Sequence, residues 1–81
     1  MKWSVYFLEL SNGDLYVGST NDLDRRLISH NAGQVQSAKS HRPLYLKSYI
    51  AVKTQRHARE LEAYFKFGSG KAIAKKRLVR D

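Results

Sequence analysis

Cysteine is absent from this sequence of 81 residues, and proline occurs only once. Without cysteine the chain has neither a disulfide framework nor a thiolate metal site, so zinc-finger architectures are excluded. The three histidines are scattered rather than spaced as zinc ligands. No apolar run approaches the length of a membrane span, and the apolar start contains Glu9 and lacks a small-residue cleavage site. We therefore expect a cytoplasmic protein with no membrane partner.

Acidic residues are also few. Seven Asp and Glu stand against fifteen Lys and Arg, which gives a formal net charge of +8. A field of this sign attracts polyanions, and nucleic acid is the usual one. The length and a hydrophobic content of 42% predict a single domain, residues 1–81, with one core. Charge alone does not separate an enzyme from a passive binder.

The first part of the chain has the pattern of a β-hairpin. Residues 3–10 and 15–18 are rich in strand-forming residues, and Asn12-Gly13 between them tolerates the positive φ of a two-residue turn. Alternation along the first strand separates two sets of side chains. One face carries Trp3, Val5 and Phe7, and the other carries Tyr6, Leu8 and Leu10.

A first helix is expected over residues 22–31. Asn21 is a suitable N-cap, with Asp24 completing a capping-box pair, and Asn31-Ala32-Gly33 provides the stop. Leu23 and Leu27 lie one turn apart and face the core.

The second half continues with a polar loop and a third strand, residues 44–52. Thr54 caps a second helix, residues 55–67, and the "GSG" of residues 68–70 breaks it. A short basic helix over residues 71–79 points Ile73 and Leu78 inward. The order β-β-α-β-α-α predicts an α+β fold: a three-stranded antiparallel sheet flanked by helices.

The first helix places Arg26 and His30 at the edge of its apolar stripe, directly after a strand that ends in Gly18. A glycine there lets a ligand or backbone approach closely. The alternative is a surface ion pair of Arg26 with Asp22 at i, i+4. Tyr6 and Tyr16 can be neighbours on the paired strands, either as ordinary packing or as groups that transfer a proton.

Glu62 lies beside the apolar stripe of the second helix, which is formed by Ala58, Leu61 and Phe65. Carboxylates are rarely buried unless they are paired or bind a metal. Two interpretations therefore remain open, a metal ligand or a partly buried ion pair with Arg26 or another cation.

The order and spacing of these residues resemble the GIY-YIG nuclease domain over about residues 4–78. The resemblance rests on Tyr6 in "VYF", Tyr16-Val17-Gly18 ten positions later, Asp22-Leu23, Arg26, and Glu62 in a Leu-Glu helix. The tail "YFKFGSGKAIAKKRL" is similar to small stand-alone bacterial members related to the nuclease module of the excision-repair endonuclease.

The resemblance also implies roles for these residues. Tyr6 and Tyr16 match the two motif tyrosines, and one of them, Tyr6 in the first place, would help to deprotonate water. Arg26 matches the catalytic arginine and His30 a helix position held by histidine or tyrosine. Glu62 matches the ligand of a single Mg²⁺ or Mn²⁺. The residues expected to bind substrate are Gly18, Ser19, Lys71 and Lys75.

Three departures from the family pattern are visible. The first motif has "VYF" in place of Gly-Ile-Tyr, although its tyrosine is kept. Ser19 stands where the repair enzymes carry a lysine, and no asparagine corresponds to the one that follows the glutamate helix in some members.

The function implied is a metal-dependent endonuclease that hydrolyses a phosphodiester bond, in DNA rather than RNA, during repair or recombination. A protein partner could direct it, since we expect no second recognition domain. The alternative is a non-catalytic nucleic-acid-binding module on the same fold. Its phosphate contacts would come from a basic tail, Lys71, Lys75, Lys76, Arg77 and Arg80.

Overall fold

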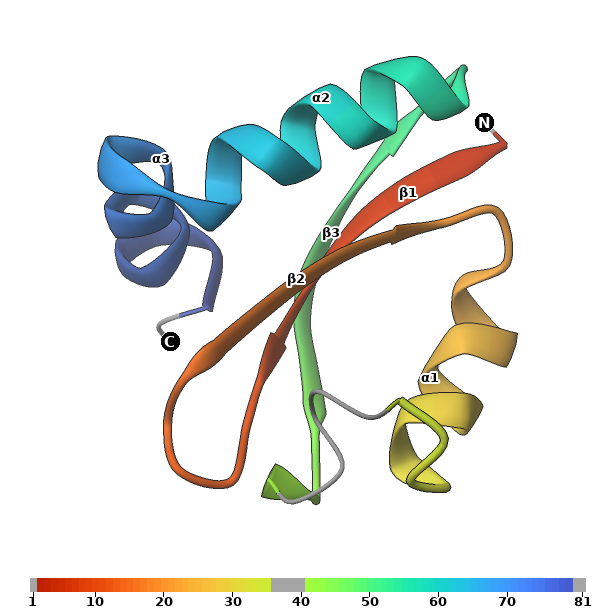
Figure 1. The fold of residues 1–81 in the computed structure, drawn as a ribbon, viewed down its shortest axis with the longest axis vertical. Helices are drawn as coiled ribbons and strands as arrows, with labels where there is room; N and C mark the ends of the chain where they lie inside the picture. Colours follow the sequence, from red (N-terminus) through yellow and green to blue (C-terminus); the bar gives the residue numbers. More distant parts are fainter. Residues whose placement is uncertain (1, 36–40, 80–81) are drawn as a thin grey trace.

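The computed structural model describes residues 2–35 and 41–79, so Arg80 and the middle of the polar loop lie outside the described residues. The predicted order of elements is confirmed (Figure 1). The strands are β1 (Trp3–Glu9), β2 (Leu15–Thr20) and β3 (Tyr45–Val52). The helices are α1 (Leu23–Asn31), α2 (Gln55–Lys66), α3 (Gly68–Ile73) and a π-helical segment, η2 (Ala74–Val79).

The sheet is antiparallel throughout, with the strand order β2-β1-β3. β1 is therefore central, and β2 lies at one edge. The β1–β2 turn contains Gly13 at φ 86°, as the Asn-Gly dipeptide predicts. β2 runs two residues beyond the predicted end at Gly18, and this extension brings Ser19 and Thr20 into register with Val5 and Ser4.

The helices cover both faces of the sheet, α1 on one side and α2 with α3 on the other (Figure 1). The predicted alternation of β1 is confirmed by the two clusters of buried side chains. Val5, Phe7 and Val17 pack with residues of α2 and η2, such as Ala58 and Phe65. On the opposite face Tyr6, Leu8 and Leu10 pack with Leu23 and Leu27 of α1. None of the helices in residues 2–35 and 41–79 is long and apolar enough to cross a membrane.

The predicted N-cap of α1 is wrong by one residue. Asp22, not Asn21, caps the helix, and its side chain accepts a hydrogen bond from the Arg25 backbone N–H at 3.2 Å. The shift occurs because β2 is longer than predicted: the Thr20 hydroxyl accepts the Asp22 N–H at 3.0 Å and fixes the turn between strand and helix. The cap of α2 is as predicted, since Thr54 accepts the His57 N–H at 3.1 Å.

The end of the chain also differs from prediction. The "GSG" residues form the first turn of α3 rather than a break after α2, because the interruption is made by extended Phe67 and by Gly68 at φ 56°. The helix then presents a different face. Ile73 is 43% exposed, whereas Ala74 and Val79 are buried, so the prediction that Ile73 points inward is wrong. Leu78 does pack against the core.

Gly18 is a position on β2 where the side chain of the neighbouring strand packs directly on the backbone. It is paired with Tyr6 across the β1–β2 ladder, and the Tyr6 ring lies over it. A Cβ atom on Gly18 would overlap the hydroxyl and the adjacent ring carbon of Tyr6. Because the residue has no side chain, the Tyr6 hydroxyl can rest on the edge strand.

We expect Gly18→Ala to destabilise the domain by about 1–3 kcal/mol, the usual cost of forcing an extra methyl group into a packed site. Urea unfolding measures this free energy. Ser4→Ala on the neighbouring strand is the matched control and should change the free energy of unfolding by less than about 0.5 kcal/mol. Equal effects of the two substitutions would contradict the close contact at Gly18.

Candidate active site

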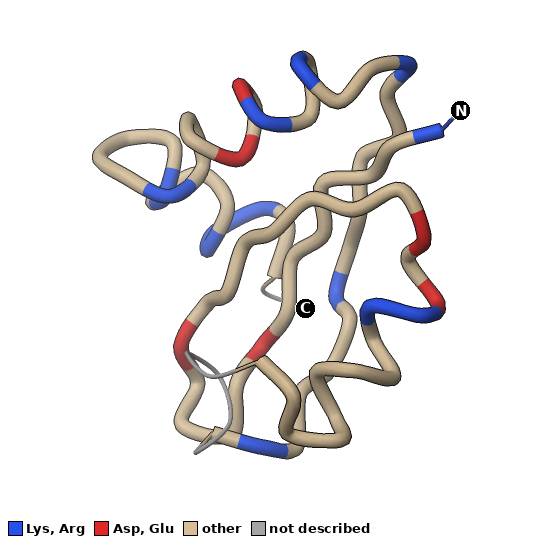
Figure 2. The backbone as a smooth tube through the Cα atoms, turned by 45° about the vertical axis from the view of Figure 1, so that its right-hand side comes forward, with Lys and Arg blue, Asp and Glu red and all other residues tan. Residues whose placement is uncertain are grey.

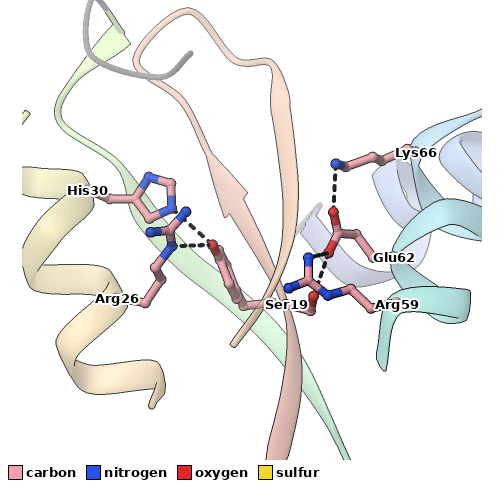
Figure 3. Close-up of polar contacts among 7 residues, drawn as sticks. Ser19, Arg26, His30, Arg59, Glu62 and Lys66 are labelled. Carbon is pink, nitrogen blue, oxygen red and sulfur yellow. Dashed lines mark hydrogen bonds and ion pairs between the residues drawn. The ribbon is translucent and has the colours of Figure 1, made fainter. Parts of the chain in front are cut away.

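Three side chains meet on the α1 face of the sheet. The Tyr6 hydroxyl lies 3.0 Å from Nε2 of His30 and accepts a hydrogen bond from Nε of Arg26 at 3.2 Å. Arg26 and His30 are one turn apart on α1 and both point toward the sheet (Figure 3). The Arg26 side chain therefore bonds Tyr6, and within residues 2–35 and 41–79 it forms no ion pair with Asp22. The adjacent Arg25 is exposed, as expected for a surface residue.

Tyr16 extends this cluster along β2. Its ring stacks against that of Tyr6 with centroids 6.4 Å apart and meets the His30 ring edge-on at 4.8 Å. The two tyrosines are diagonal neighbours, because Tyr6 is paired with Gly18 and Tyr16 with Leu8. The sequence prediction that they lie side by side is confirmed. The four side chains Tyr6, Tyr16, Arg26 and His30 thus form one contiguous group.

The cluster holds its tyrosine and histidine in neutral forms. Burial raises the pKa of Tyr6 above its ordinary value, and the hydrogen bond from Arg26 only partly offsets this. Burial, together with the positive charge of Arg26, lowers the pKa of His30 to about 4. The pKa of Arg26 is raised, chiefly by its hydrogen bond to Tyr6. At neutral pH Arg26 is therefore charged, whereas Tyr6 and His30 are neutral.

The His30 side chain is fully buried, and the hydrogen bond that it makes within the described part of the chain is to the Tyr6 hydroxyl. Its Nδ1 has no hydrogen-bond partner among the described residues. Because its pKa is about 4, His30 orients the Tyr6 hydroxyl at neutral pH rather than removing its proton.

Glu62 approaches the same edge strand from the other face of the sheet (Figure 3). Its Oε1 accepts a hydrogen bond from the Ser19 hydroxyl at 2.5 Å, and its Oε2 lies 2.7 Å from Nζ of Lys66. Nη1 of Arg59 is 4.0 Å from Oε1. The ion-pair alternative for Glu62 is thus present, but its cations come from α2 itself rather than from Arg26.

The electrostatics of Glu62 follow from these contacts. Burial acts to raise the pKa of the carboxyl group, but the hydrogen bonds from Lys66 and Ser19 and the charges of Lys66 and Arg59 outweigh it. The pKa of Glu62 is consequently lowered, and the group is a carboxylate at neutral pH. Sequence reasoning missed Lys66 and Arg59. Their i+4 and i−3 spacing from Glu62 was the available signal.

The two groups of side chains are joined by consecutive residues of β2. Gly18 supports Tyr6 on the α1 face, and Ser19 bonds Glu62 on the α2 face. The structure therefore brings Tyr6, Tyr16, Arg26 and His30 into direct contact but leaves Glu62 across the strand. The two sides still interact, because the charge of Glu62 is among the smaller effects that raise the pKa of Tyr6.

Hollows border this edge of the sheet. One of about 230 Å³ lies at the start of α1 beside Arg25 and Arg26. A pocket of about 140 Å³ is lined by Tyr16, Lys66 and Lys71. A larger groove of about 520 Å³ lies between the hairpin and the last helices and is lined by Leu15, Lys75, Lys76 and Val79, among others. Basic segments recur along α2, α3 and η2 (Figure 2). The predicted substrate residues Lys71 and Lys75 thus line hollows along β2.

Comparison with known proteins agrees with this architecture. The GIY-YIG catalytic domain model matches residues 2–77, and the chain belongs to this family. Domains of the family are generally nucleases that act on nucleic acid. The family assignment expected from the sequence is therefore confirmed.

The similar proteins are small members of the same family. A UPF0213 protein of Bacillus pumilus is 39% identical over 62 residues, which cover 75% of this chain and 63% of that protein. A UPF0213 protein of Streptococcus agalactiae is 38% identical over 63 residues, covering 76% of this chain and 72% of that protein. The solution NMR structure of a UPF0213 protein from Bacillus halodurans matches with a TM-score of 0.60 and 26% identity, over 96% of this chain and 87% of that one. The chain spans a little less than two thirds of the Bacillus pumilus relative.

The burial of His30 predicts how the stability of the domain changes with pH. Its pKa of about 4 in the folded protein is below the value of about 6.5 in an unfolded chain. Between these values the unfolded chain binds a proton that the folded domain does not, so stability falls as the pH is lowered. The contribution reaches at most about 1.4 kcal/mol per pH unit. Urea unfolding of wild type and His30→Gln from pH 7 to 4.5 should show a flatter profile for the variant. His57→Gln, at an exposed histidine of α2, is the control and should retain the wild-type slope.

Proposed function

We propose that this domain is a metal-dependent endonuclease that hydrolyses a phosphodiester bond in DNA. The observation that carries the proposal is the meeting of two groups at one edge strand. Tyr6, Arg26 and His30 lie on one side of β2 and Glu62 on the other, joined through Gly18 and Ser19. Family membership supports nuclease activity, and the net charge of +8 supports a nucleic-acid substrate.

The residues around Glu62 fit an ion that prefers oxygen ligands, such as Mg²⁺, better than an ion such as Zn²⁺ that prefers nitrogen and sulfur ligands. The described residues contain no group of three or more His, Cys, Asp or Glu that could hold an ion. Mg²⁺ keeps several waters and is often bound by one or two carboxylates together with substrate phosphate. Glu62, ionised and about 15% exposed, could supply that carboxylate. Mn²⁺ has the same preference for oxygen ligands.

Each residue of the cluster then has a chemical task. Arg26 is half-buried with its Nε on Tyr6, so the rest of its guanidinium can donate to the non-bridging oxygens of a phosphate, where negative charge builds. The neutral Tyr6 hydroxyl, fixed by His30, orients the attacking water. When bound, the metal ion supplies positive charge that polarises the phosphate and stabilises the leaving oxygen. Burial raises the pKa of Tyr6, so little phenolate is present at neutral pH, and positive charge nearby would have to lower this pKa before Tyr6 could accept a proton from water.

The nucleic-acid strand is expected to run along the edge of β2. The pocket beside Tyr16 and the groove beyond it share Leu15, so they adjoin each other along the strand. Their outer wall carries four lysines, Lys66, Lys71, Lys75 and Lys76. This row of ammonium groups offers phosphate contacts that lead away from Arg26. Substrate binding by Lys71 and Lys75 is part of this proposal.

A binding module without catalysis is the second candidate. The observation that favours it is the state of Glu62, whose two oxygens are already occupied by Ser19 and Lys66. Incubating the protein with labelled branched, nicked and single-stranded DNA in Mg²⁺ or Mn²⁺ separates the candidates. Cleavage products identify a nuclease, whereas a mobility shift without products identifies a binder.

We expect Arg26→Ala to reduce the cleavage rate by at least about 100-fold, the scale seen when one charge-stabilising donor is removed. Arg25→Ala removes the same charge from the exposed neighbouring position and should leave the rate within about threefold of wild type. Glu62→Gln should abolish metal-dependent cleavage, and Glu60→Gln on the same helix should not. Cleavage by Arg26→Ala equal to that of Arg25→Ala would remove Arg26 from the site.

The lysine row leads to a separate expectation for binding. The double variant Lys75→Gln/Lys76→Gln should reduce the slope of log affinity against log salt by about 1.5, because two phosphate contacts are lost. The control Lys53→Gln/Arg56→Gln removes the same charge at the N-terminal end of α2, the end opposite Lys66, where both side chains are exposed. Fluorescence anisotropy with a labelled oligonucleotide over a salt series measures both. Equal slopes for the two double variants would show that the lysine row is not the binding path.

A further inference from the structure

Glu62 is held by a local cage of hydrogen bonds and charge. Lys66 contacts one carboxylate oxygen at 2.7 Å, and Ser19 contacts the other at 2.5 Å. Arg59 lies farther away at 4.0 Å. Any divalent cation that binds Glu62 must approach a carboxylate whose two oxygens already have partners, one of them a cation. Lys66 is the competitor because its ammonium group sits in direct contact with Oε2.

The ammonium group of Lys66 is also free to move away from the Glu62 carboxylate. Its side chain is 42% exposed, whereas that of Glu62 is 15% exposed. The ammonium group is a compact charge on a flexible stem, so it can move without disturbing the helix. A place for it exists nearby, since Lys66 lines the pocket of about 140 Å³ together with Tyr16 and Lys71. A phosphate in that pocket would attract the same ammonium group.

We propose that Lys66 is the resident counter-ion of Glu62 and that a divalent cation binds only by displacing its ammonium group toward the pocket beside Tyr16. The inference rests on the proposed function, because it takes Glu62 as the metal ligand. Lys66 then acts as a positioning residue that sets metal affinity. In the metal-free domain it keeps a partly buried carboxylate paired, and with substrate bound it is available to a phosphate oxygen.

The test measures Mn²⁺ binding directly, by the loss of the free-ion signal in electron paramagnetic resonance, without DNA. Lys66→Met keeps the aliphatic stem and removes the charge, and we expect it to bind Mn²⁺ about fivefold more tightly than wild type, on the scale of one released ion pair. Lys66→Arg keeps the charge and should remain within about twofold of wild type. Lys71→Met removes the same charge from the same pocket without contacting Glu62 and should also remain within about twofold.

The variant Glu62→Gln distinguishes the failure of the Lys66 inference from the failure of Glu62 as the metal ligand. If it abolishes Mn²⁺ binding while Lys66→Met leaves the affinity unchanged, Lys66 is not the competitor and only this inference is overturned. If Lys71→Met tightens binding as much as Lys66→Met, the effect is general charge removal and the inference is equally overturned. If Glu62→Gln binds Mn²⁺ as wild type does, Glu62 is not the ligand, and its role in the proposed function is lost as well. Circular dichroism of each variant establishes that the fold is retained.

Discussion

The contact between the Tyr6 ring and the bare backbone of Gly18 is the constraint on which the candidate site depends. A side chain at position 18 would lift the ring off the edge strand. The hydroxyl would then leave the position where Arg26 and His30 both reach it at about hydrogen-bond distance. The absence of a side chain at Gly18 therefore lets the Tyr6 hydroxyl of β1 lie against β2 and contact α1 at the same time.

The period of two along β2 explains why the site has two sides. Gly18 faces α1 because it is paired with Tyr6, and Ser19 must therefore face α2. The Ser19 hydroxyl meets Glu62 there at 2.5 Å. Two groups on opposite faces of a sheet are ordinarily separated by its thickness. Here they approach the same stretch of one edge strand, with no further strand outside it among the described residues. A phosphate lying along that edge could contact both.

Sequence patterns predicted the parts of this arrangement that depend on local periodicity. The alternation of β1 placed Tyr6 and Phe7 on opposite faces. Helical spacing placed His30 at the edge of the apolar stripe of α1, whereas the structure buries it completely. The N-cap of α1 was missed because the hydroxyl of Thr20 organises the turn, an effect of the longer β2. The exposure of Ile73 was missed because α3 begins at Gly68 rather than after the glycines, so a different face of the helix is turned toward the core. The partners of Glu62 depend on tertiary placement, since Ser19 is 43 residues away in sequence.

Under the proposed function, folding and metal binding place opposite demands on Glu62. A partly buried carboxylate is costly unless it is paired. In a chain with only seven acidic residues and fifteen basic ones, pairing is easily supplied by neighbours one turn away on the same helix. Lys66 and Arg59 meet that need in the metal-free domain and hold the carboxyl group ionised. The same cations oppose a divalent ion at the same oxygens. A phosphate group relieves this conflict by giving the displaced ammonium group a new partner, so metal and nucleic acid should each favour binding of the other.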